Sequence, residues 1–273
     1  MNAPSAKCAV LFSGGTDSTC VAALLAASHS EIHLLTFFEE GTKNSPIPKN
    51  NILLLEKKFP AVKFVHRVLS TDSLVKKISY EGYLKNLWRH GFFLLATPGF
   101  STLSWHSTMI AYCRREGISA VADGLTRELM HFPGHMDAII GLFRKFYAGF
   151  GIEYKNPVRE WDIPPDQQFL DRLIVDHHAF FSDASLPEKK DAKTTGAYLF
   201  SLGLTPAPDV KGTDYDRRMQ HDCYPFVLYN IFAFWMYLPF RPYAQFENRL
   251  ASLFREKIAR CEAWLQDGSI SCE

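Results

Sequence analysis

The sequence lacks the cysteine spacing from which disulfide frameworks and zinc knuckles are built. Its cysteines form no Cys-x-x-Cys pair; they are Cys8, Cys20, Cys113, Cys223, Cys261 and Cys272. Such a scatter is typical of reduced thiols. The first twelve residues also lack the charged and apolar segments of a secretory signal peptide. Both absences favour a cytoplasmic protein over a small secreted domain.

An excess of charge of one sign is missing too. The 30 Lys and Arg residues oppose 29 Asp and Glu residues, so the formal net charge is only +1. Strong binding to nucleic acid through phosphates needs a basic surface, so nucleic acid is not an expected partner unless a local patch binds it. The most apolar stretch, residues 226–238, is shorter than the ~20 residues that a membrane-spanning helix needs. We expect it to form a buried helix or the subunit interface of a homodimer, without membrane contact.

The sequence does contain a Gly-rich loop between an apolar run and a helix. Residues 8–12 are apolar enough for a buried strand, and residues 20–27 have a helical composition. The loop between them consists of Ser13, Gly14, Gly15, Thr16, Asp17, Ser18 and Thr19. Glycines let a ligand approach the backbone, and the N–H groups and dipole of a helix N-terminus attract anions. We therefore expect a phosphate site here, with hydroxyl donors from Ser13, Ser18 and Thr19.

Asp17 is the one acidic residue of this loop. It could act through a bound Mg²⁺ or help to shape the turn. The loop is not a Walker A motif, because the Gly-Lys-Ser/Thr ending is missing, and its glycines are not spaced as in the dinucleotide-binding fingerprint. The alternative is a polar turn in which Asp17 or Ser18 caps a helix.

The order Ser-Gly-Gly-x-Asp-Ser at positions 13–18 resembles the pyrophosphate loop of the ATP pyrophosphatase (PP-loop) family. The resemblance implies an enzyme that uses ATP and Mg²⁺ to adenylate a carbonyl, carboxylate or ring oxygen. Pyrophosphate leaves, and a nucleophile then displaces AMP. By the same resemblance the loop holds the pyrophosphate end of MgATP, Asp17 and Ser18 take part in catalysis, and adenine lies beside Phe37 and Phe38.

Strand and helix signals alternate along the first 160 residues. Apolar runs at 32–38, 62–69, 118–122 and 151–155 predict strands, stretches at 51–59, 72–87 and 103–115 predict helices, and residues 92–96 fit a short strand or an apolar loop. Consecutive units of this kind wind into a parallel sheet. We expect an α/β domain over residues 1–160, with about five parallel strands and helices on both faces, Rossmann-like and similar to the adenine nucleotide alpha hydrolases. Residues 161–273 are expected to form a mainly helical region for substrate binding or oligomerisation.

Asp123 and Gly124 follow the fourth expected strand. The carboxyl ends of parallel strands open on one crevice, which places this pair on the same side as the phosphate loop. The family resemblance implies that the pair helps to hold the nucleotide or Mg²⁺, with Asp123 among the catalytic residues. An Asx turn formed by Asp123 is the alternative.

The next segment, residues 127–137, is dense in groups that bind or titrate. Its candidate substrate residues are Arg127, His131, His135 and Asp137. In outline, residues 132–137 resemble the substrate-facing loop of the 7-cyano-7-deazaguanine synthases, a branch of the PP-loop family. The resemblance implies that these residues face the acceptor. Alternatively, each histidine is buried and satisfied by backbone groups. An intervening Pro-Gly pair disfavours helical pairing of the two histidines on zinc.

Zinc ligation is poorly supported elsewhere in the chain. The synthase branch has a four-cysteine zinc site near its C-terminus, which this sequence does not reproduce. A metal at His221 and Cys223 would need distant ligands. His177 and His178, at the end of a helix expected over residues 166–180, point in different directions, so a solvated helix end is the better expectation.

Taken with the resemblance, these features predict an AMP-forming ligase that makes a C–N bond. The expected acceptor is a deazapurine or another small nucleobase-like or carboxylate molecule, with ammonia as the nucleophile. A first alternative is tRNA thiolation, which needs a cysteine pair and a basic surface; Cys113 and Cys223 would be its candidates. A second alternative is a nucleotide-binding module without chemistry.

Overall fold

A five-stranded parallel sheet organises the chain. The computed structural model describes residues 7–39, 49–127, 131–162, 193–211, 213–217 and 224–270. The strands are β1 (Cys8–Leu11), β2 (Glu31–Phe38), β3 (Lys63–Ser70), β4 (Ala120–Asp123) and β5 (Glu153–Lys155), in the order β3-β2-β1-β4-β5. Every neighbouring pair is parallel. The expected α/β class with five parallel strands is confirmed.

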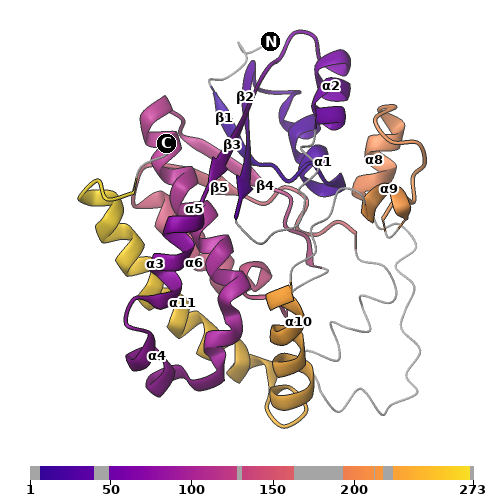
Figure 1. Cartoon of the computed structure of the whole chain (residues 1–273). Helices are drawn as coiled ribbons and strands as arrows, with labels where there is room; N and C mark the ends of the chain where they lie inside the picture. The colour runs from indigo at the N-terminus through magenta and orange to yellow at the C-terminus, as the bar shows by residue number, and fades with distance from the viewer. Residues whose placement is uncertain are drawn as a thin grey trace, which may run out of the picture.

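Helices cover both faces of this sheet (Figure 1). On one face, α1 (Thr16–Leu25), α2 (Lys49–Lys58) and α8 (Thr195–Ser201) bury an apolar cluster with Val10 and Leu34. On the other face, α3 (Asp72–Tyr80), α5 (Thr97–Glu116), α6 (Asp137–Ala148) and α11 (Tyr243–Gln266) pack over Ala9 and Leu35. Successive strand residues point to opposite faces, so strands buried on both faces are apolar throughout.

The helix expected over residues 72–87 is interrupted. It ends at Tyr80, and α4 (Tyr83–His90) begins after Gly82, whose φ of 66° lies in the left-handed region that glycine adopts readily. Residues 92–96, expected as a strand or loop, belong to the 3₁₀-helix η1 (Gly91–Ala96), which leads directly into α5. Pro98 lies in the first turn of α5, where a missing N–H costs no hydrogen bond.

The C-terminal part contains the helices that the sequence pattern indicated. Besides α8 and α11 it has α9 (Asp214–Arg217), α10 (Tyr224–Ile231) and the π-helix η5 (Phe232–Tyr237). In the sheet region, the short 3₁₀-helix η3 (Pro133–His135) precedes α6. The expected helix 166–180, with His177 and His178, and the pair His221 and Cys223 lie outside the described residues. A domain boundary near residue 160 stays a prediction. Among the described helices, none has the length and apolarity needed to cross a membrane.

Candidate functional site

The phosphate loop, residues 13–19, lies at the carboxyl end of the central strand β1 (Figure 1). The neighbours of β1 are β2 on one side and β4 on the other, so the chain leaves this point in both directions across the sheet. Ligands of open parallel sheets bind at such a switch point. The N-cap of α1 is Gly15, which has no side chain to accept from the N–H groups of the first helical turn. This geometry is compatible with the expected anion site, which stays a prediction.

Backbone contacts fix the shape of the loop. Gly14 has φ 82°, a conformation that favours glycine. Its carbonyl oxygen accepts from Asn51 Nδ2 of α2 at 2.7 Å, and the same amide nitrogen donates to Thr19 Oγ1 at 3.3 Å. Ser13 Oγ and Ser18 Oγ lie 3.1 Å apart. Asn51 is buried and was missed by the sequence reasoning, because it lies 37 positions from Gly14.

Gly124 packs directly on this loop. A Cβ atom at position 124 would lie 2.7 Å from the carbonyl carbon of Asp17 and 2.7 Å from the backbone nitrogen of Ser18. Only glycine allows β4 and the loop to approach so closely. The structure thus brings the two sequence-predicted groups together and gives Gly124 a steric role.

Asp17 is joined to residues from much later in the chain. Thr195 Oγ1 donates to Asp17 Oδ1 at 2.7 Å, and Lys211 Nζ lies 2.9 Å from the same oxygen. Lys211 Nζ also lies 3.3 Å from Asp162 Oδ2. Burial raises the pKa of Asp17, whereas the Lys211 ammonium and the Thr195 hydroxyl act in the opposite direction. The site therefore contains a lysine that no local motif indicates, 194 positions from Asp17.

Asp123 is buried among donors from β5 and the segment after it. One oxygen accepts from Tyr154 Oη through a short hydrogen bond, and the other accepts from Asn156 Nδ2 at 2.8 Å and from the Leu125 N–H at 3.1 Å. The last contact is the Asx turn considered from the sequence. Burial raises the pKa of Asp123 to about 6. Its carboxyl group orders the segment between the sheet and the next loop, and a role toward nucleotide or Mg²⁺ stays a prediction.

Phe37 and Phe38 end β2, next to the phosphate loop. The Phe37 ring stacks on Trp105 with centroids 6.3 Å apart and planes 9° apart, while Phe38 is exposed. Trp105 Nε1 also donates to Glu39 at 2.9 Å. A pair of stacked aromatic rings therefore lies at the end of β2, and its contact with adenine stays a prediction.

Residues 131–137, the histidine loop, are held mainly by their own contacts. His131 Nε2 is hydrogen-bonded to Asn230 Oδ1 at 3.2 Å, and His135 Nδ1 lies 3.3 Å from the carbonyl oxygen of Thr126. Burial lowers the pKa of His131 to about 4 and that of His135 to about 3. Both histidines are therefore neutral near pH 7. The contact of His135 with a backbone carbonyl fits the alternative of a histidine satisfied by backbone groups, whereas His131 is bonded to a side chain. Substrate contact stays a prediction for both.

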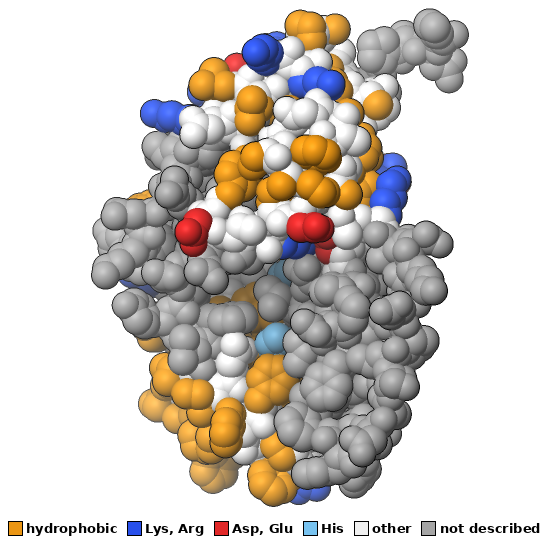
Figure 2. All heavy atoms as spheres, turned by 90° about the vertical axis from the view of Figure 1, so that its right-hand side faces the viewer, with side chains coloured by type: hydrophobic (Ala, Val, Ile, Leu, Met, Phe, Trp, Pro, Cys, Tyr) orange, Lys and Arg blue, Asp and Glu red, His pale blue; other side chains and the backbone are white. Residues whose placement is uncertain are grey.

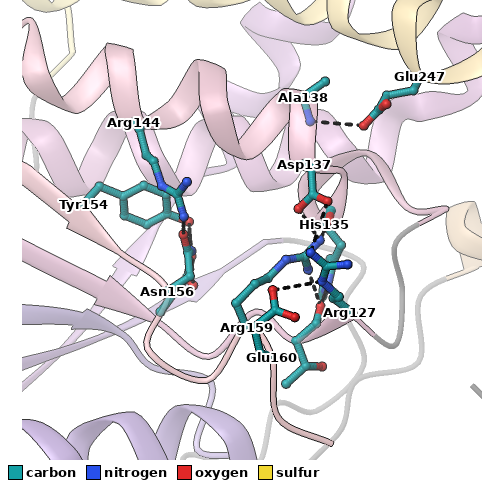
Figure 3. A network of polar contacts seen from close by, with 12 residues as sticks. Arg127, His135, Asp137, Ala138, Arg144, Tyr154, Asn156, Arg159, Glu160 and Glu247 are labelled. Atoms are coloured by element: carbon teal, nitrogen blue, oxygen red, sulfur yellow. Dashed lines mark hydrogen bonds and ion pairs between the residues drawn. The ribbon is translucent and has the colours of Figure 1, made fainter. Parts of the chain in front are cut away.

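Charged residues converge beside this loop (Figure 3). Arg127 Nε lies 3.0 Å from Glu160, and Arg127 Nη2 lies 3.7 Å from Asp137. Arg159 Nη2 lies 3.0 Å from Asp137 and donates to the carbonyl oxygen of His135 at 2.6 Å. Arg159 is buried and was not predicted. The candidates Arg127 and Asp137 therefore meet in one ion-pair network, where Arg127 remains partly exposed.

Within the described residues, no group of three His, Cys, Asp or Glu side chains could hold a metal ion. Cys8, Cys20, Cys113 and Cys261 are buried. Burial raises the pKa of Cys8, Cys20 and Cys261. These thiols are therefore poor nucleophiles. For Mg²⁺, the carboxylate of Asp17 is the suitable oxygen donor in the phosphate loop.

Comparison with known proteins leaves the family open. No family model matches the chain, and no curated protein matches it. Among solved structures, one similar chain is described as a predicted subunit of a tRNA methyltransferase from Methanocaldococcus jannaschii. It matches at 20% identity and a TM-score of 0.38, over 73% of this chain and 89% of that chain. So weak a likeness carries no inference about activity. Membership of the PP-loop family stays a prediction.

Proposed function

We propose that the chain is an ATP-dependent, AMP-forming enzyme in which the phosphate loop holds the pyrophosphate end of MgATP. The observation that carries the proposal is the position of this loop. It joins the central strand to the N-terminus of α1, at the switch point of the sheet, with Gly124 packed against its backbone. Helix N-termini that follow a Gly-rich turn are well suited to bind phosphates through their N–H groups.

The charges around Asp17 support the same proposal. Lys211 Nζ, 2.9 Å from Asp17 Oδ1, would come next to bound phosphates. Together with the first-turn N–H groups of α1, this ammonium would stabilise the charge that develops on the leaving pyrophosphate. Mg²⁺, when bound, offsets part of the triphosphate charge, and Asp17 would hold it.

The second substrate would bind beyond the carboxyl ends of β4 and β5. Asp123 and Gly124 lead from β4 to Arg127, whose partly exposed guanidinium could pair with a carboxylate. This arrangement supports a small carboxylate or nucleobase-like acceptor, such as a deazapurine, with ammonia as the nucleophile that displaces AMP. A C–N bond would form and AMP would leave.

Pyrophosphate release from ATP tests the proposal. Purified protein is incubated with MgATP, ammonium and a panel of candidate acceptors, and pyrophosphate and AMP are quantified. Asp17→Ala should lower the rate by about 100-fold or more, as loss of a residue in a charge-stabilising site does. Asp72→Ala is the matched control, because Asp72 is also an acid in the first turn of a helix but belongs to α3.

Two outcomes would contradict the proposal. Release of ADP and phosphate would rule out attack at the α-phosphorus. If Asp17→Ala and Asp72→Ala lowered the rate of pyrophosphate release equally, the phosphate loop would have no specific role in the reaction. ATP binding without turnover would instead support a nucleotide-binding module. Thiolation is the weaker alternative, because Cys113 is fully buried.

A further inference from the structure

Most of the large exposed hydrophobic side chains on the described surface belong to two segments, α4 with the start of η1, and α10 with η5 and the turn after it. We call this surface the aromatic face. It comprises Tyr83, Leu84, Leu87, Trp88, Phe92, Leu228, Ile231, Trp235, Met236 and Phe240. Trp88 is 94% exposed, Trp235 79% and Phe240 73%. Both segments lie at the end of the molecule away from α2 (Figure 1), and hydrophobic side chains are dense at the lower end of the surface in Figure 2.

The two segments meet where η1 contacts η5. The rings of Phe92 and Phe232 have centroids 6.4 Å apart, and those of Phe93 and Phe232 have centroids 5.2 Å apart. Phe93 and Phe232 are buried, so they fix the segments to each other from below. Phe92 itself is exposed, so the exposed surfaces of the two segments adjoin there.

Exposed and buried side chains alternate along this segment. Leu228, Ile231 and Trp235 are exposed, whereas Tyr229 and Phe232 are buried in the core. Core packing thus accounts for the buried side chains and leaves the exposed, equally apolar ones unexplained. In a monomer, exposed helical positions would ordinarily be polar.

The size of the aromatic face suits a subunit interface. Its ten side chains, at the exposures given by the structure, amount to on the order of 1,000 Å² of accessible area, given ~150–250 Å² for a whole aromatic side chain. The largest apolar patch of a typical monomer is about 300–600 Å². A standard interface buries about 800 Å² on each partner.

The composition favours a second protein surface over lipid. Residues 224–240 contain no Asp, Glu, Lys, Arg or His. Helices that lie on membranes carry Lys and Arg on their polar face, whereas the cores of homodimer interfaces are depleted of charge and rich in Trp, Tyr, Phe and Met. Basic and acidic side chains form ion pairs at the border of α4. Arg89 Nη1 lies 3.0 Å from Glu256, and Arg260 Nη1 lies 3.5 Å from Glu81. Such pairs are typical of a polar rim.

We propose that the aromatic face is the interface of an isologous dimer, with a second copy of this chain as its occupant. In a two-fold contact the same patch is used on both subunits, so each anchor residue acts twice. Trp88 and Trp235 are the anchors, since they are the largest and most exposed side chains of the face. The inference is independent of the proposed nucleotide chemistry.

Sedimentation velocity on the full-length protein, from about 1 to about 100 µM, tests the dimer. Wild-type protein should sediment as a dimer over most of this range. Trp88→Glu and Trp235→Glu should each raise the dimer Kd by about 30-fold or more. Leu53→Glu is the matched control, because Leu53 is also exposed but lies on α2; its Kd should not change. Near-ultraviolet circular dichroism and the melting temperature show that the variants are folded.

Three results would overturn the proposal. The first is wild-type protein that stays monomeric at the highest concentration. The second is a dimer that neither tryptophan substitution weakens. The third is monomeric protein that co-sediments with vesicles containing phosphatidylserine and loses this binding in Trp88→Glu, which would make lipid the occupant of the face. Pyrophosphate release measured on the same variants separates failure of the dimer from failure of the proposed chemistry.

Discussion

The phosphate loop and the histidine loop were both predicted as functional from the sequence, and they differ in where their polar groups point. In the phosphate loop, the N-cap Gly15 leaves the first-turn N–H groups of α1 without a capping side chain. In the histidine loop, His131 is buried and His135 is half-buried, and they are bonded to Asn230 and Thr126. The first arrangement suits an incoming anion, and the second is internally satisfied.

This difference teaches how to weigh a cluster of reactive residue types. A histidine whose ring nitrogen is already bonded and whose pKa is lowered by burial does not titrate near neutral pH. A glycine at which an added Cβ would collide with a neighbouring backbone is required by packing, as Gly124 is. The segment from Asp123 to Arg127 touches both loops, so its residues can separate the two kinds of role.

The largest expected effect is on stability at Asp123. Its pKa is about 6 in the folded protein against 3.8 ordinarily, so between pH 4 and pH 6 the folded state binds a proton that the unfolded chain has lost. Stability should therefore fall as pH rises through this window, by roughly 3 kcal/mol. Asp123→Asn should lack this fall. Urea unfolding at pH 4, 5, 6 and 7 measures it, and parallel curves for the two proteins would refute the burial argument.

Gly124→Ala should cost about 100-fold in pyrophosphate release, because a displacement of about 1 Å in a reacting loop has effects of that size. The added Cβ would meet the backbone of Asp17 and Ser18 at 2.7 Å, so the loop must shift. Gly141→Ala is the matched control, since a Cβ there meets nothing within 4 Å. Equal activity in the two variants would show that the close packing of Gly124 on the phosphate loop is not required for activity.

Lys211→Met should raise the Kd for MgATP about tenfold, which corresponds to ~1.4 kcal/mol. The change removes an ammonium group 2.9 Å from Asp17. Without it, the negative charge of the Asp17 carboxylate would repel the phosphates. Lys145→Met makes the same charge change at an exposed position on α6 and should leave the affinity unchanged. Isothermal titration with a non-hydrolysable ATP analogue gives both constants. An unchanged Kd in Lys211→Met would separate Lys211 from the nucleotide.

His131→Gln should have the smallest effect, about 1 kcal/mol of stability from one altered hydrogen bond. Pyrophosphate release and its pH profile between pH 5 and pH 8 should not change, because His131 stays neutral there. A profile that loses an inflection near pH 6 to 7 in this variant would place a titrating histidine in the reaction and join the histidine loop to the site.

Much of the sheet follows from short-range patterns. Apolar runs predicted all five strands to within a few residues. The signal is strongest for β1, β2 and β4, which are mostly buried and therefore apolar, whereas the edge strands β3 and β5 also carry exposed residues. Helix boundaries were less accurate. The break occurs at Gly82, whose left-handed φ interrupts the helix, and α5 starts at Thr97, directly after η1, instead of at residue 103.

The sequence by itself determined where a phosphate could bind, because a strand, two glycines and a helix N-terminus occupy adjacent positions in the chain. Only the tertiary structure decided which groups serve that site. Asn51, Gly124, Thr195 and Lys211 reach the phosphate loop from 32 to 194 positions away. Tertiary packing also lowers the pKa values of His131 and His135, so both side chains are uncharged near pH 7. The physical reason is that sheet order and burial set which polar groups meet one another and which remain for a ligand.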